Sequence, residues 1–199
     1  MYNRGVKVES RVVEIPPGEP WKVAIVSDTH SKPHPKIGAH LAERRPHLIL
    51  HGGDIGDLEV LRQLEAYAPT IAVRGNIDAN TPEVPEAVTI DCRRGPDLML
   101  RIFLTHIAVY GPKLRADVRK RAQAAKAGLV VCGHSHVPFL ARDGSLAVFN
   151  PGSIGPRRFQ LPITFGMLSL DEGRVRLEHV DCETNLKWLP PEAPAPRPG

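Results

Sequence analysis

The sequence is poor in several residue types that mark common classes of protein. Only three of its 199 residues are cysteines, Cys92, Cys132 and Cys182, and no C-x-x-C pair occurs. An odd and scattered set of this kind argues against a disulfide framework and predicts free thiols in a reducing compartment. Aromatic residues make up 5% of the chain, which leaves few platforms for stacking nucleic-acid bases.

Long apolar runs are also missing. None is long enough to cross a membrane, and the first ten residues, MYNRGVKVES, lack the apolar core of a signal peptide. We therefore expect a cytoplasmic protein with no membrane contact. The formal net charge of +4 is mild: it permits contact with nucleic acid, but no basic run with interleaved aromatics indicates such contact. No pattern predicts an oligomeric state.

The remaining composition, 42% hydrophobic and 24% charged, is typical of a single globular domain, which we place at residues 21–185. Residues 1–20 form an N-terminal extension that ends in the break PPGEP, and its imperfect alternation at 6–15 favours an added edge strand. Residues 186–199 end in PPEAPAPRPG. Because that composition offers nothing to bury, the sequence predicts a disordered tail there.

Short apolar runs rich in β-branched residues alternate with helical patterns at 37–45, 58–67 and 114–128. This alternation predicts parallel βαβ units whose strands are buried on both faces. Residues 86–105 contain two runs around the turn RGPD, and the turn DEG at 171–173 separates two more, so both segments are typical of hairpins. The sequence therefore predicts an α/β protein with two packed sheets flanked by helices.

Five of the predicted strands end in residue types that bind metals. These residues are Asp28 and His30, then Asp54, then Asn76 and Asp78, then His106, and finally His134 and His136. Ligands of such sheets bind beyond the carboxyl ends of the strands. Carboxylate, imidazole and amide groups together suit Mn²⁺, Fe²⁺ or Zn²⁺ better than Mg²⁺. There are too many candidates for one tetrahedral ion, so we predict two divalent ions, roughly 3.5–4 Å apart, that share a carboxylate.

The motifs D-T-H, G-D-x-x-D, G-N-x-D, T-H and G-H-S-H occur in that order within residues 21–180. In this the chain resembles the calcineurin-like metallophosphoesterases, and NPGS at 150–153 is similar to their compact prokaryotic phosphodiesterase branch, whose fold the retromer scaffold subunit shares. The resemblance implies an αββα sandwich, two mixed β-sheets flanked by helices. It also implies a dinuclear phosphoesterase in which a water between the ions attacks phosphorus.

The substrate class implied by the resemblance is a small-molecule or nucleotide phosphodiester, rather than a monoester. The metal we expect is Mn²⁺, with iron, zinc, nickel or cobalt as the alternatives. The competing interpretation is a protein-interaction scaffold on the same fold, with weak or no catalysis. The complete set of ligand positions argues against a purely structural role.

Seven positions match the metal ligands of the family: Asp28, His30 and His136 for the first ion, Asn76, His106 and His134 for the second, and Asp54 as the carboxylate shared by both. Taken alone, an aspartate such as Asp28 or Asp54 could instead cap the helix that follows. The presence of five motifs in order favours the ligand interpretation.

The resemblance assigns catalysis to Asn76 and His106, and Asn76 also contacts the substrate. Many relatives have a histidine that acts on the leaving group where this chain has Ile77. That departure leaves two interpretations open: Asp78 helps as an acid, or the substrate has a leaving group that departs unaided.

Two arginines, Arg74 and Arg157, are candidate contacts to the substrate phosphate, with a solvated surface role as the alternative. His51 either orients a ligand or is structural, and Asp57 is predicted to cap the helix that follows it. The histidines away from the motifs are predicted to lie at the surface: His34, His40, His47 and His179.

Overall fold

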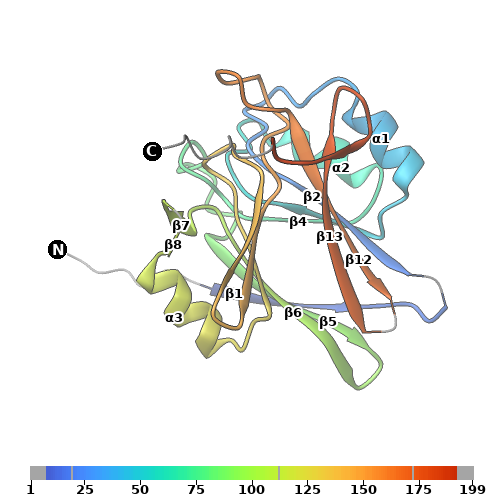
Figure 1. Ribbon diagram of the computed structural model, residues 1–199, viewed down its shortest axis with the longest axis vertical. Helices are drawn as coiled ribbons and strands as arrows, with labels where there is room; N and C mark the ends of the chain where they lie inside the picture. Colours follow the sequence, from blue (N-terminus) through green and yellow to red (C-terminus); the bar gives the residue numbers. More distant parts are fainter. Residues whose placement is uncertain (1–7, 19, 112, 172, 192–199) are drawn as a thin grey trace, which may run out of the picture.

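The computed structural model describes residues 8–18, 20–111, 113–171 and 173–191. Two six-stranded mixed sheets pack face to face, and helices cover their outer faces (Figure 1). Helices α1 (Ile37–Arg44) and α2 (Glu59–Glu65) cover the first sheet, and α3 (Ala116–Ala124) covers the second. The arrangement is the αββα sandwich predicted from the sequence.

Both sheets mix parallel and antiparallel pairs. The first sheet has the order β14 (Lys187–Trp188), β13 (Arg174–Asp181), β12 (Thr164–Asp171), β2 (Trp21–Val26), β3 (Leu48–His51), β4 (Thr70–Ala72). The second has the order β1 (Val8–Glu14), β5 (Ala87–Arg94), β6 (Asp97–Thr105), β9 (Leu129–Val131), β11 (Leu146–Asn150), β10 (Phe139–Asp143). A short hairpin joins β7 (Val109–Tyr110) to β8 (Lys113–Leu114).

Strand β2 shows why the central strands read as unbroken apolar runs. Its Val23 and Ile25 face the second sheet, in the core between the two sheets. Its Ala24 and Val26 point the other way, into the core beneath α1 and α2. Because successive side chains alternate between faces, the stretch from Val23 to Val26, which is covered on both sides, is apolar at every position.

Helix α3 makes a third core with the outer face of the second sheet. Val118 and Ala122 on the helix are buried against Phe103, Val130 and Val148. The spacing of four residues between the two helical positions places them on one face, as the sequence predicts. Three cores between four layers therefore hold the domain together.

The parallel strands point their carboxyl ends in a common direction within each sheet. Strands β2, β3 and β4 are mutually parallel, and so are β6, β9 and β11. The two predicted hairpins are present: β5 with β6 and β12 with β13 are antiparallel, with a bulge in β5 at Cys92 and Arg93. The loops after the parallel strands contain all seven predicted metal ligands.

The segments outside the central domain differ in part from expectation. Strand β1 pairs in parallel with β5 at the edge of the second sheet. Lys187 and Trp188, inside the predicted tail of 186–199, pair with β13 as strand β14, so the prediction of disorder is wrong for these two residues. Residues 192–199 lie outside the described residues. Within the described part of the chain, no helix has the length and apolarity needed to cross a membrane.

Two histidines predicted at the surface are buried instead. His40 lies on the face of α1 that also buries Ile37 and Leu41, and its Nε2 hydrogen-bonds to the Cys182 carbonyl at 2.8 Å. His179 on β13 stacks on Phe149. Each ring combines apolar contact area with one hydrogen-bonded nitrogen, since His179 Nε2 lies 2.8 Å from the Asn150 carbonyl, so a polar atom of each ring is satisfied on burial.

Candidate metal centre

The loops after four strands bring metal-binding atoms together. Ligand atoms of Asp28, His30 and His136 lie within 4.8 Å of one another, and so do those of Asp28, Asp54 and His106. Asp28 and His30 follow β2, Asp54 follows β3, His106 follows β6 and His136 follows β9. Because β2 and β3 belong to one sheet and β6 and β9 to the other, the centre forms where the carboxyl ends of both sheets meet.

The backbone at this centre is unusual. Five predicted ligands have left-handed φ values between +48° and +71°: Asp28, His30, Asp54, His134 and His136. Side-chain-bearing residues rarely adopt this conformation, and each such residue costs of order 1 kcal/mol or more. Hydrogen bonds between loops maintain it, from Asp28 N–H to the Gly53 carbonyl at 2.9 Å and from His30 N–H to the Asp54 carbonyl at 3.0 Å.

Two glycines permit the loops to approach each other. A Cβ at Gly75 would overlap the carboxylate and the backbone nitrogen of Asp54, and a Cβ at Gly133 would overlap Ser27 and the Asp28 carboxylate. Any larger residue would displace the carboxylate beside it. The motifs G-N-x-D and G-H-S-H therefore begin with glycine for a steric reason.

Asp54 lies between two of the histidines. Its Oδ1 is 3.3 Å from Nε2 of His106, and its Oδ2 is 3.8 Å from Nε2 of His30. Burial alone would raise the pKa of Asp54, but the adjacent imidazoles and the N–H of Ile77, 3.2 Å from Oδ1, hold it well below its usual range. The carboxylate is thus ionised and has oxygens directed to both sides of the centre.

Asp28 is completely buried and held from several directions. Its Oδ2 accepts hydrogen bonds from Ser27 Oγ at 2.6 Å and from the His134 N–H at 3.1 Å. Its Oδ1 lies 3.3 Å from His136 Nε2. A buried carboxylate with fixed orientation beside an imidazole nitrogen is a strong candidate ligand.

His106 provides a test of whether a cation fits. Its Nδ1 donates to the Gly52 carbonyl at 2.7 Å, so Nε2 of the neutral ring carries a lone pair. That Nε2 is buried and makes no hydrogen bond within the described residues, although it faces Asp54. Burial lowers the pKa of His106, but the Asp54 and Asp28 carboxylates outweigh burial and raise it. The Nε2 lone pair of His106 and the nearby carboxylate oxygens of Asp54 and Asp28 can all bind a cation, so these residues fit a metal.

Asn76 and His134 lie at the outer side of the centre and belong to neither group of three. Both side chains are exposed. The His134 ring lies beside that of His106, with centroids 5.2 Å apart. Asn76 and His106 line a groove of about 260 Å³ together with Arg74, so the structure places these two predicted ligands beside His106.

The Asp78 carboxylate is engaged with backbone groups of two neighbouring loops. Its Oδ2 accepts the N–H groups of Ile55 at 3.0 Å and Gly75 at 2.8 Å, and its Oδ1 accepts that of Gly56 at 2.9 Å. The side chain is buried. Three backbone N–H groups therefore fix the orientation of this carboxylate. Asp78 joins two loops of the centre.

The contacts of Arg157 favour the surface role that the sequence left open as the alternative. This side chain pairs with Glu183 at 2.6 Å and donates to the Leu161 carbonyl at 2.9 Å. Its neighbour Arg158 reaches the centre, with Nη2 3.1 Å from Nε2 of His30. The sequence signal was the pair of arginines at 157 and 158, and only the fold reveals which one faces the centre.

His51 and Asp57 take the structural alternatives. Gly53 N–H donates to His51 Nδ1 at 3.1 Å, and Nε2 meets Thr29 Oγ1 at 3.0 Å, so neither ring nitrogen is directed at the ligand groups. Asp57 Oδ1 accepts the Glu59 N–H at 2.9 Å at the start of α2, in the manner of a helix cap.

Two side chains of the NPGS segment hold the ligand loops in place, a role that the sequence did not indicate. Asn150 is completely buried, and its Nδ2 donates to the Gly133 carbonyl at 2.7 Å and lies 3.1 Å from Ser135 Oγ. Ser153 Oγ donates to the Asp28 carbonyl at 2.9 Å. These two side chains tie the loop after β11 to the loops that carry the histidines and the first aspartate.

Comparison with known proteins agrees with this geometry. The model of the calcineurin-like phosphoesterase superfamily domain matches residues 21–173. A probable metallophosphoesterase of Methanothermobacter thermautotrophicus is 29% identical over 138 residues, which is 66% of this chain and 76% of that protein. Phosphodiesterase YfcE of Escherichia coli is 31% identical over 109 residues, which is 54% of this chain and 56% of YfcE. The match thus spans little more than half of YfcE.

Solved structures share the fold at lower identity. A predicted phosphoesterase from Streptococcus pneumoniae superposes with a TM-score of 0.62 at 20% identity, covering 83% of this chain and 92% of that one. Vacuolar Protein Sorting 29 from Cryptosporidium parvum superposes with a TM-score of 0.61 at 16% identity, covering 81% and 97%. At these identities the superpositions establish the fold alone.

Proposed function

The chain belongs to the calcineurin-like phosphoesterase superfamily, and we propose that it is a phosphodiesterase that uses two divalent metal ions. The observation that carries the proposal is the pair of ligand groups that meet at Asp28, with the Asp54 carboxylate between His30 and His106. The match to a phosphodiesterase, YfcE, supports the same reaction class.

The ligand assignment follows the two groups. Asp28, His30 and His136 would hold one ion; His106, with Asn76 and His134 beside it, would hold the other; and Asp54 would serve both. When bound, such a pair of ions neutralises phosphoryl oxygens and turns a shared water into a nucleophile near neutral pH. We expect Mn²⁺, with iron, zinc, nickel or cobalt as alternatives, because the donors combine imidazole nitrogen with carboxylate oxygen.

The chain's own groups orient the substrate. Arg158 lies beside His30 and is placed to meet a phosphate oxygen. The exposed Asn76 offers an amide on the opposite side, next to His106. The ionised Asp54 is held by the Ile77 N–H, so it keeps both oxygens aimed into the centre. These positions favour a single orientation of the phosphoryl group.

In this proposal neither Asp78 nor Ile77 supplies a proton to the leaving group. Asp78 is engaged with three backbone N–H groups, and Ile77 is 51% exposed with an apolar side chain. Esters whose alcohol is acidic need no proton, so aryl phosphodiesters should react faster than alkyl phosphodiesters.

The decisive experiment measures hydrolysis of bis(4-nitrophenyl) phosphate and 4-nitrophenyl phosphate. Metal-stripped protein receives Mn²⁺, Fe²⁺, Zn²⁺, Ni²⁺, Co²⁺ or Mg²⁺ one at a time, and bound metal is counted by elemental analysis. We expect the diester to be preferred, Mn²⁺ to be the strongest activator, and about two ions per chain. A single bound ion at full activity contradicts the dinuclear site, and a preference for the monoester contradicts the substrate class.

A scaffold role is the second candidate, and one observation favours it. Large apolar side chains are exposed next to residues of the centre: Ile77 after Asn76, Val137 after His136, and Phe159 after Arg158, with Phe159 93% exposed. Such a rim suits a protein partner. Absence of turnover with every metal would make this candidate the better one.

A further inference from the structure

The groove beside His106 is lined by three arginines. Arg74 follows β4, Arg115 precedes α3, and Arg121 lies in the last turn of α3. They share the groove of about 260 Å³ with Asn76 and His106. The groove is therefore continuous with the proposed catalytic centre and has a cationic wall.

The three arginines differ in how their charge is used. Arg74 pairs with Glu86, and Arg115 Nε lies 3.2 Å from Asp117 Oδ1. Both carboxylates also line the groove. Arg121 is half-buried and makes neither an ion pair nor a side-chain hydrogen bond within the described residues. One guanidinium in the groove therefore has five N–H donors and no carboxylate opposite it.

In the part of the chain that the structure describes, no side-chain nitrogen of Arg121 is both buried and without a partner, so the guanidinium is accessible to an anion that enters the groove. The contact it fits is planar and anionic, because a guanidinium binds phosphate or carboxylate oxygens in pairs. The scissile phosphate itself belongs at the ligand groups. The free charge on Arg121 thus fits a second anionic group, on the part of the substrate that extends from the centre past Asn76.

We propose that the groove lined by Arg121 is a subsite for a second phosphate, so that the preferred substrate is a phosphodiester that carries a further phosphate group. The proposal rests on the proposed function. Arg121 determines specificity and takes no part in the chemical step.

The test compares two chromogenic substrates that differ by one group: thymidine 5′-(4-nitrophenyl phosphate) and its 3′-phosphorylated form. Each is assayed with the wild-type protein, with Arg121→Gln and with Lys120→Gln. Lys120 is an exposed residue of the same helix that does not line the groove, so its variant loses the same charge elsewhere. Product is followed as 4-nitrophenolate, with Mn²⁺ present.

We expect the wild-type protein to favour the 3′-phosphorylated substrate in kcat/KM by about tenfold or more, the value of a charge-assisted hydrogen bond. Arg121→Gln should lose most of that preference and keep its rate on the simpler diester. Lys120→Gln should keep the preference. Equal loss on both substrates, or equal effects of the two variants, overturns the proposal.

A binding measurement separates this proposal from the proposed function. Calorimetry gives Kd for thymidine 3′,5′-bisphosphate and for thymidine 5′-monophosphate with Mn²⁺-loaded protein. If neither diester is hydrolysed, the phosphodiesterase assignment fails while the subsite is still decided by binding. Tighter binding of the bisphosphate that Arg121→Gln abolishes and Lys120→Gln retains supports the subsite. No preference for the bisphosphate rejects it.

Discussion

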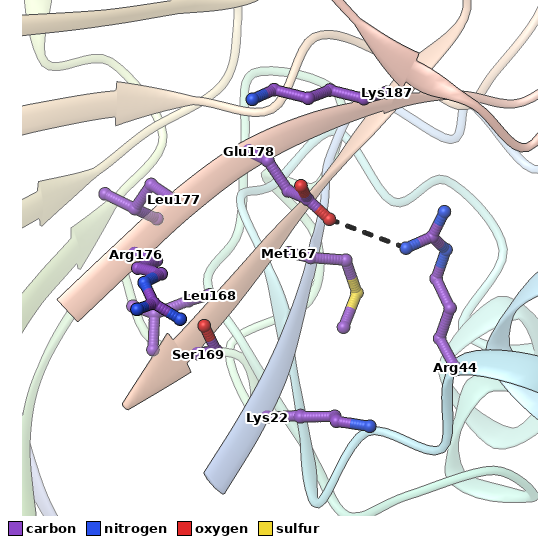
Figure 2. Close-up of a pocket in the computed structure, with 9 residues that line it drawn as sticks. All are labelled: Lys22, Arg44, Met167, Leu168, Ser169, Arg176, Leu177, Glu178 and Lys187. Atoms are coloured by element: carbon purple, nitrogen blue, oxygen red, sulfur yellow. Dashed lines mark ion pairs between the residues drawn. The ribbon is translucent and has the colours of Figure 1, made fainter. Parts of the chain in front are cut away.

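The first sheet has two charged regions that differ in kind. Beyond the carboxyl ends of β2 and β3, carboxylates and imidazoles meet within a few ångströms. Toward the amino end of β2 lies a larger hollow of about 620 Å³ around Lys22, Arg176 and Lys187 (Figure 2). Among the described residues that line it, the one carboxylate belongs to Glu178, which pairs with Arg44 at 3.6 Å. The larger hollow therefore has charge of mainly one sign and no imidazole.

The backbones of the two regions differ as well. The hollow is built on the regular strands β12 and β13 and on the end of α1. The metal centre has five candidate ligands in a left-handed conformation. Regular strands can carry exposed lysines and arginines at no conformational cost, whereas convergence of ligands requires strain that surrounding hydrogen bonds must offset. The comparison teaches that the size of a cavity is a poor guide to function in this protein. A strained backbone around converging carboxylates and imidazoles is a better guide.

The largest expected effect comes from removing the shared carboxylate. Asp54→Ala should lose both ions and roughly 10³-fold or more in kcat/KM, because several kcal/mol of transition-state stabilisation depends on the metals. Elemental analysis and diester hydrolysis measure the two losses.

Asp57→Ala is the matched control, since Asp57 lies in the same motif and only receives the Glu59 N–H. It should cost about 1 kcal/mol of stability as a lost helix cap and leave metal content unchanged. If both variants lose metal equally, the special position of Asp54 is refuted.

A smaller effect is expected from crowding the same carboxylate without removing it. A methyl group at Gly75 would overlap the Asp54 carboxylate. Displacement by about an ångström costs roughly 10²-fold in rate, so Gly75→Ala should reduce kcat/KM by about that factor. Gly128→Ala is the control, because its Cβ would meet only Leu100 at 3.7 Å. An unchanged rate for Gly75→Ala would show that the loops can move apart freely.

The next prediction concerns how the free energy of unfolding depends on pH through His51, which lies in the first sheet beside the ligand loops. Burial lowers the pKa of His51 to about 4. The unfolded chain therefore binds a proton below pH 6.5 that the folded protein does not accept, and stability falls as pH decreases from about 6.5 to about 4. The loss from this group approaches ~3 kcal/mol. NMR should show a His51 ring that does not titrate between pH 8 and pH 5.5, while a blocked histidine peptide does. A His51 midpoint near that of the peptide would contradict a buried neutral ring.

The sequence predicts the layers and the ligand set because both follow from local pattern. Val23 to Val26 read as one apolar run, and Asp28 and His136 lie in the loops that follow β2 and β9. The order of the motifs then supports the two groups of ligands. What these residues have in common is that their role is decided by the strand that they follow.

The sequence is least informative for residues whose role is decided by distant partners. Nothing near Asp78 in the sequence reveals that three N–H groups from two loops converge on it. Arg157 and Arg158 are equivalent in the sequence, and only Glu183 separates their roles. For His40 a local signal existed, since it shares a helical face with Ile37 and Leu41, but a histidine was treated as polar.

The smallest effect is expected in the hollow of Figure 2. Lys22 and Arg176 are exposed and form no ion pair within the described part of the chain. Their charges lie in solvent, where salt screens them within about 8 Å. The double variant Lys22→Gln/Arg176→Gln should therefore keep kcat/KM for the diester within about a factor of two and retain its metals. A tenfold loss that disappears in high salt would show that the hollow attracts the substrate electrostatically. In that case both regions would serve catalysis, the hollow by attracting the substrate and the metal centre by the chemical step.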